Sequence, residues 1–186
     1  MTPMPRPALG VDETVLWQGK PKKSAFIATK SLSLFPIAIV WLAFDLGFIG
    51  SLFPDSEDAS LFFLLPFFLL HLTPVWLWLA SLLTANRRYQ NTAYYVTDRR
   101  LIIRHGALAV NEISLHYKDL RTVTTHVGLL DKPFRVGDVC FYTGLHTRTR
   151  YGTRETVYTF EELEDYEAVY ARIQRILLDV REMDEP

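Results

Sequence analysis

Two long apolar segments in the first half of the chain constrain its fold more than any other feature. They cover residues 31–53 and 60–85, and each exceeds the roughly 20 residues with which an α-helix crosses about 30 Å of hydrocarbon. A chain of 186 residues could hardly enclose two helices that are apolar on every face. We therefore expect a transmembrane hairpin over residues 31–86, with "PDSEDAS" as its short connection.

The distribution of basic residues predicts the orientation of this hairpin. No lysine or arginine occurs from Ser31 to Asn86, whereas both flanks are basic. Because basic residues favour the cytoplasmic side, we expect a multi-pass protein of the cell (inner) membrane with both termini in the cytoplasm. The chain then divides into a cytoplasmic N-terminal segment (1–30), the membrane hairpin (31–86) and a cytoplasmic domain (87–186).

Three prolines predict the shape of the hairpin. Pro36 falls in the first turn of its helix, where the missing N–H group costs little. Pro66 and Pro74 fall inside the second apolar segment, and they should bend the helix there.

Two ionisable residues, Asp45 and His71, lie within the apolar segments. Burying a charge in hydrocarbon is costly, so such residues indicate either a function or a specific partner. Their depths differ by roughly 5 Å at 1.5 Å per residue, which leaves them within reach of each other. We favour a structural hydrogen bond between helices, because two helices alone cannot enclose a channel. The alternative is a membrane-embedded transport or enzyme subunit that uses this pair.

Beyond Arg88 the sequence changes from continuous apolar runs to alternation, which is typical of strands. The expected strands are residues 92–97, 100–106, 108–117, 120–128, 137–144 and 154–160. Their close spacing predicts an antiparallel meander that closes as a small barrel or forms a pair of packed sheets. We expect "ETVLWQGKPKK" to add a further strand. The alternative is an interfacial segment with Trp17 at headgroup level.

The C-terminal stretch 161–183 carries apolar residues at steps of three and four, which predicts one amphipathic helix that covers an open end of the sheet. Thr159 is a candidate N-cap for this helix. The apolar stripe consists of Leu163, Tyr166, Val169, Tyr170, Ile173, Ile176, Leu177 and Val180.

Three motifs carry a family resemblance. A "Y-x-V-T-D-x-R-L-I-x-R-x-G" pattern begins at Tyr95, an "LWxGxP" element precedes the hairpin, and a pair of glycines lies in "VGLLDKPFRVGDV". The matched positions are Leu16, Trp17, Gly19, Pro21, Tyr95, Val96, Thr97, Asp98, Arg100, Leu101, Ile102, Arg104, Gly106, Gly128 and Gly137. With two apolar segments before the pattern, the chain resembles the bacterial pleckstrin-homology-like (PH-like) two-span membrane proteins. The resemblance implies a membrane α-hairpin plus an α+β domain, in which a PH-like antiparallel β-barrel is capped by a C-terminal α-helix.

The same resemblance implies a non-catalytic protein-interaction or assembly adaptor at the inner membrane surface. Its partner would be a membrane protein that the sequence does not identify, and a homo-oligomer is compatible with this function. The alternative is binding of anionic lipid headgroups, because residues 87–160 carry 12 Lys/Arg and 6 Asp/Glu. The candidate lipid or partner contacts are Arg99, Arg100, His146, Arg148, Arg150 and Arg154. The short "TDRR" turn leaves no cradle for a multiply phosphorylated headgroup.

No sequence feature favours catalysis, a cofactor, a metal or nucleic acid. The chain lacks GxSxG, P-loop and HExxH motifs, and its formal net charge is -1. The single cysteine, Cys140, is interpreted as a small core residue. His105, His116 and His126 recur at intervals of 11 and 10, which makes a zinc site across adjacent strands an alternative, but histidines scattered over strands are more often surface or half-buried polar residues.

Overall fold

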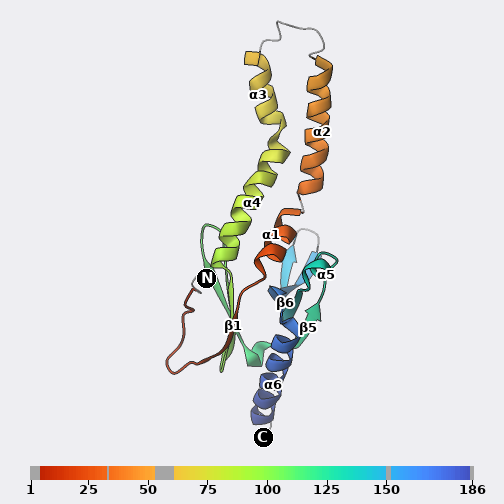
Figure 1. Cartoon of the computed structure of the whole chain (residues 1–186). Coiled ribbons are helices and arrows are strands. Elements are labelled where there is room, and N and C mark those ends of the chain that lie inside the picture. Colours follow the sequence, from red (N-terminus) through yellow and green to blue (C-terminus); the bar gives the residue numbers. More distant parts are fainter. Residues whose placement is uncertain (1–4, 33, 53–60, 150–151, 185–186) are drawn as a thin grey trace. The chain divides into compact units, whose positions relative to one another are not determined.

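A computed structural model describes residues 5–32, 34–52, 61–149 and 152–184 (Figure 1). The chain forms two compact units, one made of residues 1–26 and 87–186 and the other of residues 27–86. We call them the sheet unit and the helical unit. The elements in chain order are β1 (Val15–Gly19), α1 (Lys23–Leu32), α2 (Phe35–Leu52), α3 (Leu61–His71), α4 (Thr73–Asn91), β2 (Ala93–Thr97), β3 (Arg100–His105), β4 (Asn111–His116), η1 (Tyr117–Asp119), β5 (Thr122–His126), α5 (Asp131–Phe134), β6 (Gly137–Thr149), β7 (Gly152–Leu163) and α6 (Tyr166–Asp184).

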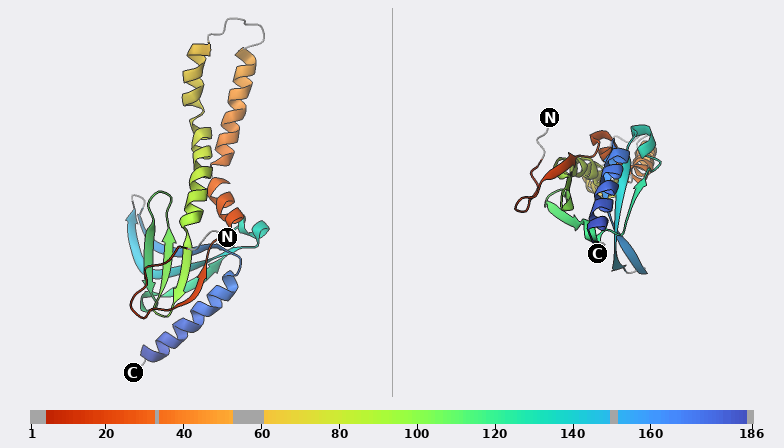
Figure 2. Two further views of the ribbon diagram at one scale, coloured as in Figure 1. Left: turned by 60° about the vertical axis from the view of Figure 1, so that its left-hand side comes forward. Right: turned by 90° about the horizontal axis from the view of Figure 1, so that it is seen from below.

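In the helical unit, α2 lies alongside α3 and the first part of α4 (Figures 1 and 2). The two continuous spans predicted over 31–53 and 60–85 are not present as single helices. No single helix among the described residues has both the length and the hydropathy to cross a membrane. One pair meets both requirements together, namely Lys23–Leu32 with Phe35–Ser51, which are bent by 55° relative to each other.

The prolines account for part of this difference. Pro36 is the second residue of α2, in the first turn as expected, and Pro66 lies inside α3. Pro74 was expected to bend a continuous helix, but it instead lies in the first turn of a new helix, because α3 ends at His71 and α4 begins at Thr73. A proline has no N–H group for the carbonyl four residues earlier, so it is better tolerated at a helix start than inside a helix.

The first sheet of the sheet unit has the strand order β1-β2-β3-β4, with antiparallel neighbours. The N-terminal strand is confirmed, because Trp17 pairs with Val96 and Gly19 with Tyr94. Trp17 stacks on Phe160 with ring centroids 6.1 Å apart and packs against the domain core. The LWxGxP element is therefore a strand of this sheet, and the interfacial alternative is wrong.

The second sheet has the order β5-β6-β7, and the two sheets remain open. The closed barrel predicted from the resemblance is therefore wrong, whereas the alternative of two packed sheets is right. Two features separate the sheets. The η1 turn carries the chain from β4 to β5, and α6 covers the core between the two sets of strands (Figure 2).

The predicted C-terminal amphipathic helix is present as α6, which packs against β5, β6 and η1. Val169, Ile173 and Leu177 of the stripe are buried in the core. The helix begins later than expected, since residues up to Leu163 still belong to β7, where Leu163 pairs with Gly137. Thr159 lies inside β7 and pairs with Cys140, so it does not cap the helix.

Candidate functional site

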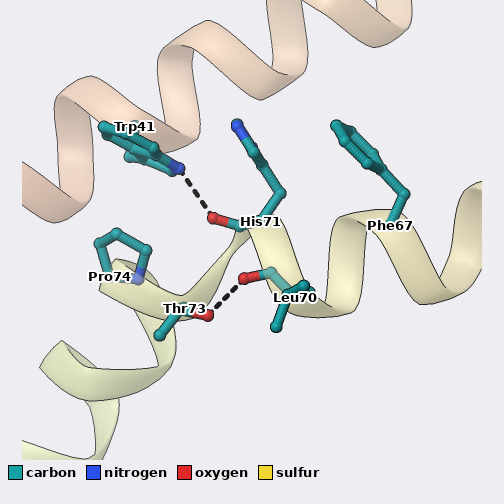
Figure 3. A pocket seen from close by; sticks show the side chains of 6 residues that line it. All are labelled: Trp41, Phe67, Leu70, His71, Thr73 and Pro74. Atoms are coloured by element: carbon teal, nitrogen blue, oxygen red, sulfur yellow. Dashed lines mark hydrogen bonds between the residues drawn. The ribbon is translucent and has the colours of Figure 1, made fainter.

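The break between α3 and α4 leaves three backbone carbonyls without their usual helical donors, and a side chain caps each of them. The indole N–H of Trp76 donates to the carbonyl of Leu69 at 3.1 Å, and the Thr73 hydroxyl donates to that of Leu70. The indole N–H of Trp41 in α2 donates to the carbonyl of His71 at 2.7 Å (Figure 3). A helix break at which each freed carbonyl has a side-chain donor needs no water.

The structure brings Asp45 and His71 together, as their depths in the sequence predicted. The Nδ1 atom of His71 lies 2.7 Å from Oδ1 of Asp45, and Asp45 is only 2% exposed. The Phe67 ring stacks on the imidazole with centroids 5.1 Å apart. The pair fixes α2 against α3 next to the break, which is the structural hydrogen bond that we favoured. The second carboxylate oxygen of Asp45, Oδ2, is buried and has no hydrogen-bond partner among the described residues.

A pocket of about 370 Å³ opens beside the break, within the helical unit. Its lining residues are Trp41, Phe67, Leu70, His71, Thr73 and Pro74 (Figure 3). Three polar groups at its wall are already hydrogen-bonded, since the Trp41 indole and the Thr73 hydroxyl cap carbonyls and Nδ1 of His71 binds Asp45. The pocket is therefore an apolar recess formed by the helix break.

In the sheet unit, the motif at the β2–β3 turn holds an ion pair with a buried carboxylate, which the sequence did not predict. The guanidinium of Arg100 donates through Nε and Nη2 to the two carboxylate oxygens of Glu13, both at 2.8 Å. The Thr97 hydroxyl also donates to Glu13 at 2.8 Å, and it accepts a hydrogen bond from the Arg100 amide. The hydrogen bonds from Arg100 lower the pKa of Glu13 from 4.5 to about 2, although burial opposes this shift.

The N-terminal segment covers the outer face of the first sheet. Arg104 Nη1 donates to the carbonyl of Arg6 at 2.9 Å, and the Tyr95 hydroxyl donates to that of Pro5. The carboxylate of Asp98 accepts a hydrogen bond from the Thr14 amide at 3.0 Å. Residues of the family pattern thus bind the segment before β1 to β2 and β3. Arg100 was predicted to contact lipid or a partner, but its guanidinium instead binds Glu13 within the sheet unit.

The remaining motif positions mark the ends of strands. Gly19 ends β1, Gly106 follows β3, and Gly128 and Gly137 flank the connection between β5 and β6. Pro21 is buried beyond the end of β1. These residues shape the sheet unit, and none contributes a functional group to a reaction.

The β6–β7 hairpin carries most of the predicted basic contacts. His146, Arg148 and Arg154 are exposed, as is Arg99 at the β2–β3 turn, whereas Arg150 lies outside the described residues. The cross-strand pairs are His146 with Glu155, Thr147 with Arg154, and Arg148 with Thr153. Since successive residues of a strand face opposite sides, Arg148 and Arg154 project from opposite faces of the hairpin. Glu155 also lies on the same face as His146 and Arg148, so no strongly basic surface forms from these residues.

Cys140 and the three histidines do not form a catalytic or zinc site of the kind weighed from the sequence. Burial raises the pKa of the Cys140 thiol, which disfavours the reactive thiolate. His105 pairs with Asn111 and His116 with Arg100, so these two histidines lie at opposite ends of the β3–β4 ladder. His126 belongs to the other sheet.

An exposed apolar loop connects β5 to α5, and sequence reasoning missed it. Val127, Leu129 and Leu130 are exposed, with 85% of Leu129 accessible to solvent. The signal in the sequence was "VGLL", an apolar run beside a glycine just after an expected strand. We call residues 127–130 the apolar loop. Clustering of exposed apolar side chains in one short loop is typical of an interaction surface.

Comparisons with known proteins found similarity to a solved structure and to a family model. One similar solved structure is the "Vps36 N-terminal PH domain", with 17% sequence identity and a TM-score of 0.35. The alignment covers 50% of this chain and 66% of that chain. No curated protein matches the chain. The family model described as "Bacterial PH domain" matches residues 38–177, from within α2 to near the end of α6, and the chain therefore belongs to the bacterial PH domain family.

Proposed function

We propose that this protein is a non-catalytic docking module, and that its helical unit anchors it in the cell membrane. The helical unit would insert in the bilayer, and the PH-like domain would bind a membrane-protein partner at the inner surface. The family supports an interaction or lipid-binding module, and catalysis has no support among the described residues.

The capped break between α3 and α4 is the observation that carries the anchoring proposal. In water an open helix end can bind solvent, whereas in hydrocarbon each unpaired carbonyl costs several kcal/mol. All three freed carbonyls have side-chain donors, and two of these donors are indoles. The surrounding helices expose large apolar side chains, including Val40 at 68% and Leu70 at 78%. A surface of this kind is stable in lipid and unfavourable in water.

Replacing Leu70 with lysine should weaken retention of the chain in membranes. A lysine at the centre of a bilayer helix costs about 2.5 kcal/mol or more, so a larger fraction of the protein should leave the membrane pellet during alkaline carbonate extraction. Leu178→Lys is the matched control, because Leu178 is an exposed leucine of α6 in the sheet unit. Equal retention of the two variants would contradict the anchoring proposal, as would release of the unchanged protein.

The apolar loop supports the docking part of the proposal. Val127, Leu129 and Leu130 expose apolar area next to the sheet edge formed by β5. Burying a leucine side chain at an interface contributes about 1.5–3 kcal/mol, which is more than one exposed cation contributes near a headgroup, about 1 kcal/mol. The two described arginines of the β6–β7 hairpin project from opposite faces, so lipid binding remains the second candidate.

A photoreactive amino acid at position 129 should crosslink recurrently to one protein in native membranes. The same group at Leu178, which is also exposed, is the control and should give no recurrent adduct. A third variant, with the group at Leu145 near the predicted basic contacts, distinguishes the two candidates. Protein adducts at position 129 would support docking. Anionic lipid adducts at position 145, with none to protein at position 129, would favour the lipid alternative and contradict docking.

A further inference from the structure

Three potential metal ligands meet at the connection between β5 and β6. One ligand atom each from His126, Asp131 and Asp138 lies within 4.8 Å of the other two. His126 and Asp138 are directly opposite each other in the β5–β6 register. Asp131 is the first residue of α5, in the connection between these strands. The cluster thus combines an imidazole from one strand with carboxylates from the next strand and from the loop between them.

Backbone hydrogen bonds fix both carboxylates. The amide of Gly128 donates to Oδ2 of Asp131 at 2.6 Å, and the amide of Glu162 donates to Oδ1 of Asp138 at 2.8 Å. These bonds orient the carboxylates and leave their negative charge in place. Ligands that are held in this way lose little conformational freedom when an ion binds.

The charge around the cluster is unfavourable without a cation. Asp131 is only 6% exposed, so its carboxylate is largely removed from water. The half-buried carboxylate of Asp138 has an oxygen within 4.8 Å of one from Asp131. Two acidic side chains at such a distance repel each other, and a divalent cation between them would reverse this repulsion.

Gly128 keeps the backbone close to the cluster. A Cβ atom at this position would lie 3.0 Å from Oδ2 of Asp131 and 3.7 Å from a ring carbon of His126. The first distance is tighter than ordinary van der Waals contact, so a larger residue would displace the Asp131 carboxylate. The glycine that the family pattern left without a function therefore permits the approach of backbone, carboxylate and imidazole.

We propose that His126, Asp131 and Asp138 form a binding site for a divalent transition-metal ion, with Zn²⁺ preferred. One imidazole nitrogen and two carboxylate oxygens are ligands that Zn²⁺ accepts, and three protein ligands leave a position for water. The imidazole disfavours Mg²⁺ and Ca²⁺, which take oxygen ligands. The ion would link β5 to β6 through the connection that contains the apolar loop. The proposal does not depend on membrane anchoring or on docking.

The test is calorimetric titration of the full-length chain, purified in detergent without a histidine tag, with ZnCl2. We expect one ion per chain, and His126→Ala and Asp138→Asn should each weaken the affinity by at least about tenfold. His116→Ala is the matched control, because His116 is an exposed strand histidine opposite Arg100 in the other sheet. This control should bind Zn²⁺ like the unchanged protein. Circular dichroism of the metal-free variants checks that each has folded.

Three results would overturn the proposal. The first is the absence of a 1:1 binding event, and the second is unchanged affinity in both His126→Ala and Asp138→Asn. The third is an equal response to CaCl2, which would contradict a role for the imidazole. Crosslinking at position 129 and membrane retention are separate measurements, so failure of this proposal and failure of the proposed function are distinguishable.

Discussion

Replacing Gly106 with alanine is expected to destabilise the sheet unit by about 4 kcal/mol or more. Gly106 has a φ of +145°, which residues with a Cβ atom rarely adopt. In addition, a Cβ atom here would lie 1.9 Å from the carbonyl oxygen of Ala109, so the backbone itself would have to move. Losses of this size are exceptional for one methyl group and follow from the combination of strain and overlap. Urea unfolding in detergent, followed by the circular dichroism of the strands, measures the change.

Gly152→Ala separates the two causes. Gly152 also has a positive φ, +126°, but a Cβ atom there would meet nothing within 4 Å among the described residues. Its substitution should therefore cost only the conformational strain, on the order of 1–2 kcal/mol. Equal losses in the two variants would show that the overlap at Ala109 has no effect.

Replacing Glu13 with glutamine is expected to cost about 3 kcal/mol, at the low end for a buried ion pair, because Arg100 is left without its partner and is only partly buried. The Glu13 side chain is 2% exposed and that of Arg100 is 20% exposed. Glutamine keeps the shape of the side chain but cannot accept both hydrogen bonds from the guanidinium. Glu182→Gln is the matched control, since Glu182 is exposed on α6 and the same substitution there should change stability by less than about 0.5 kcal/mol.

The same pair predicts a dependence of stability on pH. The pKa of Glu13 is about 2 in the folded protein and 4.5 in the reference state. A lowered pKa means that the contribution is complete above pH 4.5 and is lost as the pH falls from 4.5 toward 2. The free energy of unfolding of the unchanged protein should fall over this range more steeply than that of Glu13→Gln. Parallel curves for the two proteins would contradict the role assigned to the pair.

Local patterns predicted much of the sheet unit. The three-and-four spacing in the last stretch predicted α6, because that spacing places Val169, Ile173 and Leu177 on one face of a helix. The β2–β3 hairpin followed from the alternation on either side of Asp98 and Arg99. The open sheets were not predictable in this way. Closure of a barrel depends on whether the edge strands of the two sheets pair with each other, and here α6 covers the core between them.

Contacts between distant parts of the chain were the least predictable. In the sequence, Glu13 is one acidic residue of a polar segment with no evident partner. Its carboxylate lies 2.8 Å from Nη2 of Arg100 only in the folded chain. The second apolar segment is hydrophobic over most of its length, so its hydropathy does not indicate a helix break. The break depends on Pro74 and on hydrogen bonds from indoles, one of which belongs to Trp41 in α2. His126 and Asp138 are recognisable in the sequence as possible metal ligands. Their proximity depends on the register of β5 and β6, whereas the histidine spacing suggested a site formed by His105, His116 and His126.

The pairing of β1 with β2 has a consequence for how the protein is made. The ribosome completes β1 before residues 27–86 and β2 only after them, so the first strand must wait for its neighbour. Phe26 and Tyr89, close to the two junctions, have ring centroids 6.3 Å apart in the folded protein. Residues 87–97 must therefore end on the same side of any membrane as β1, because the first sheet cannot form otherwise.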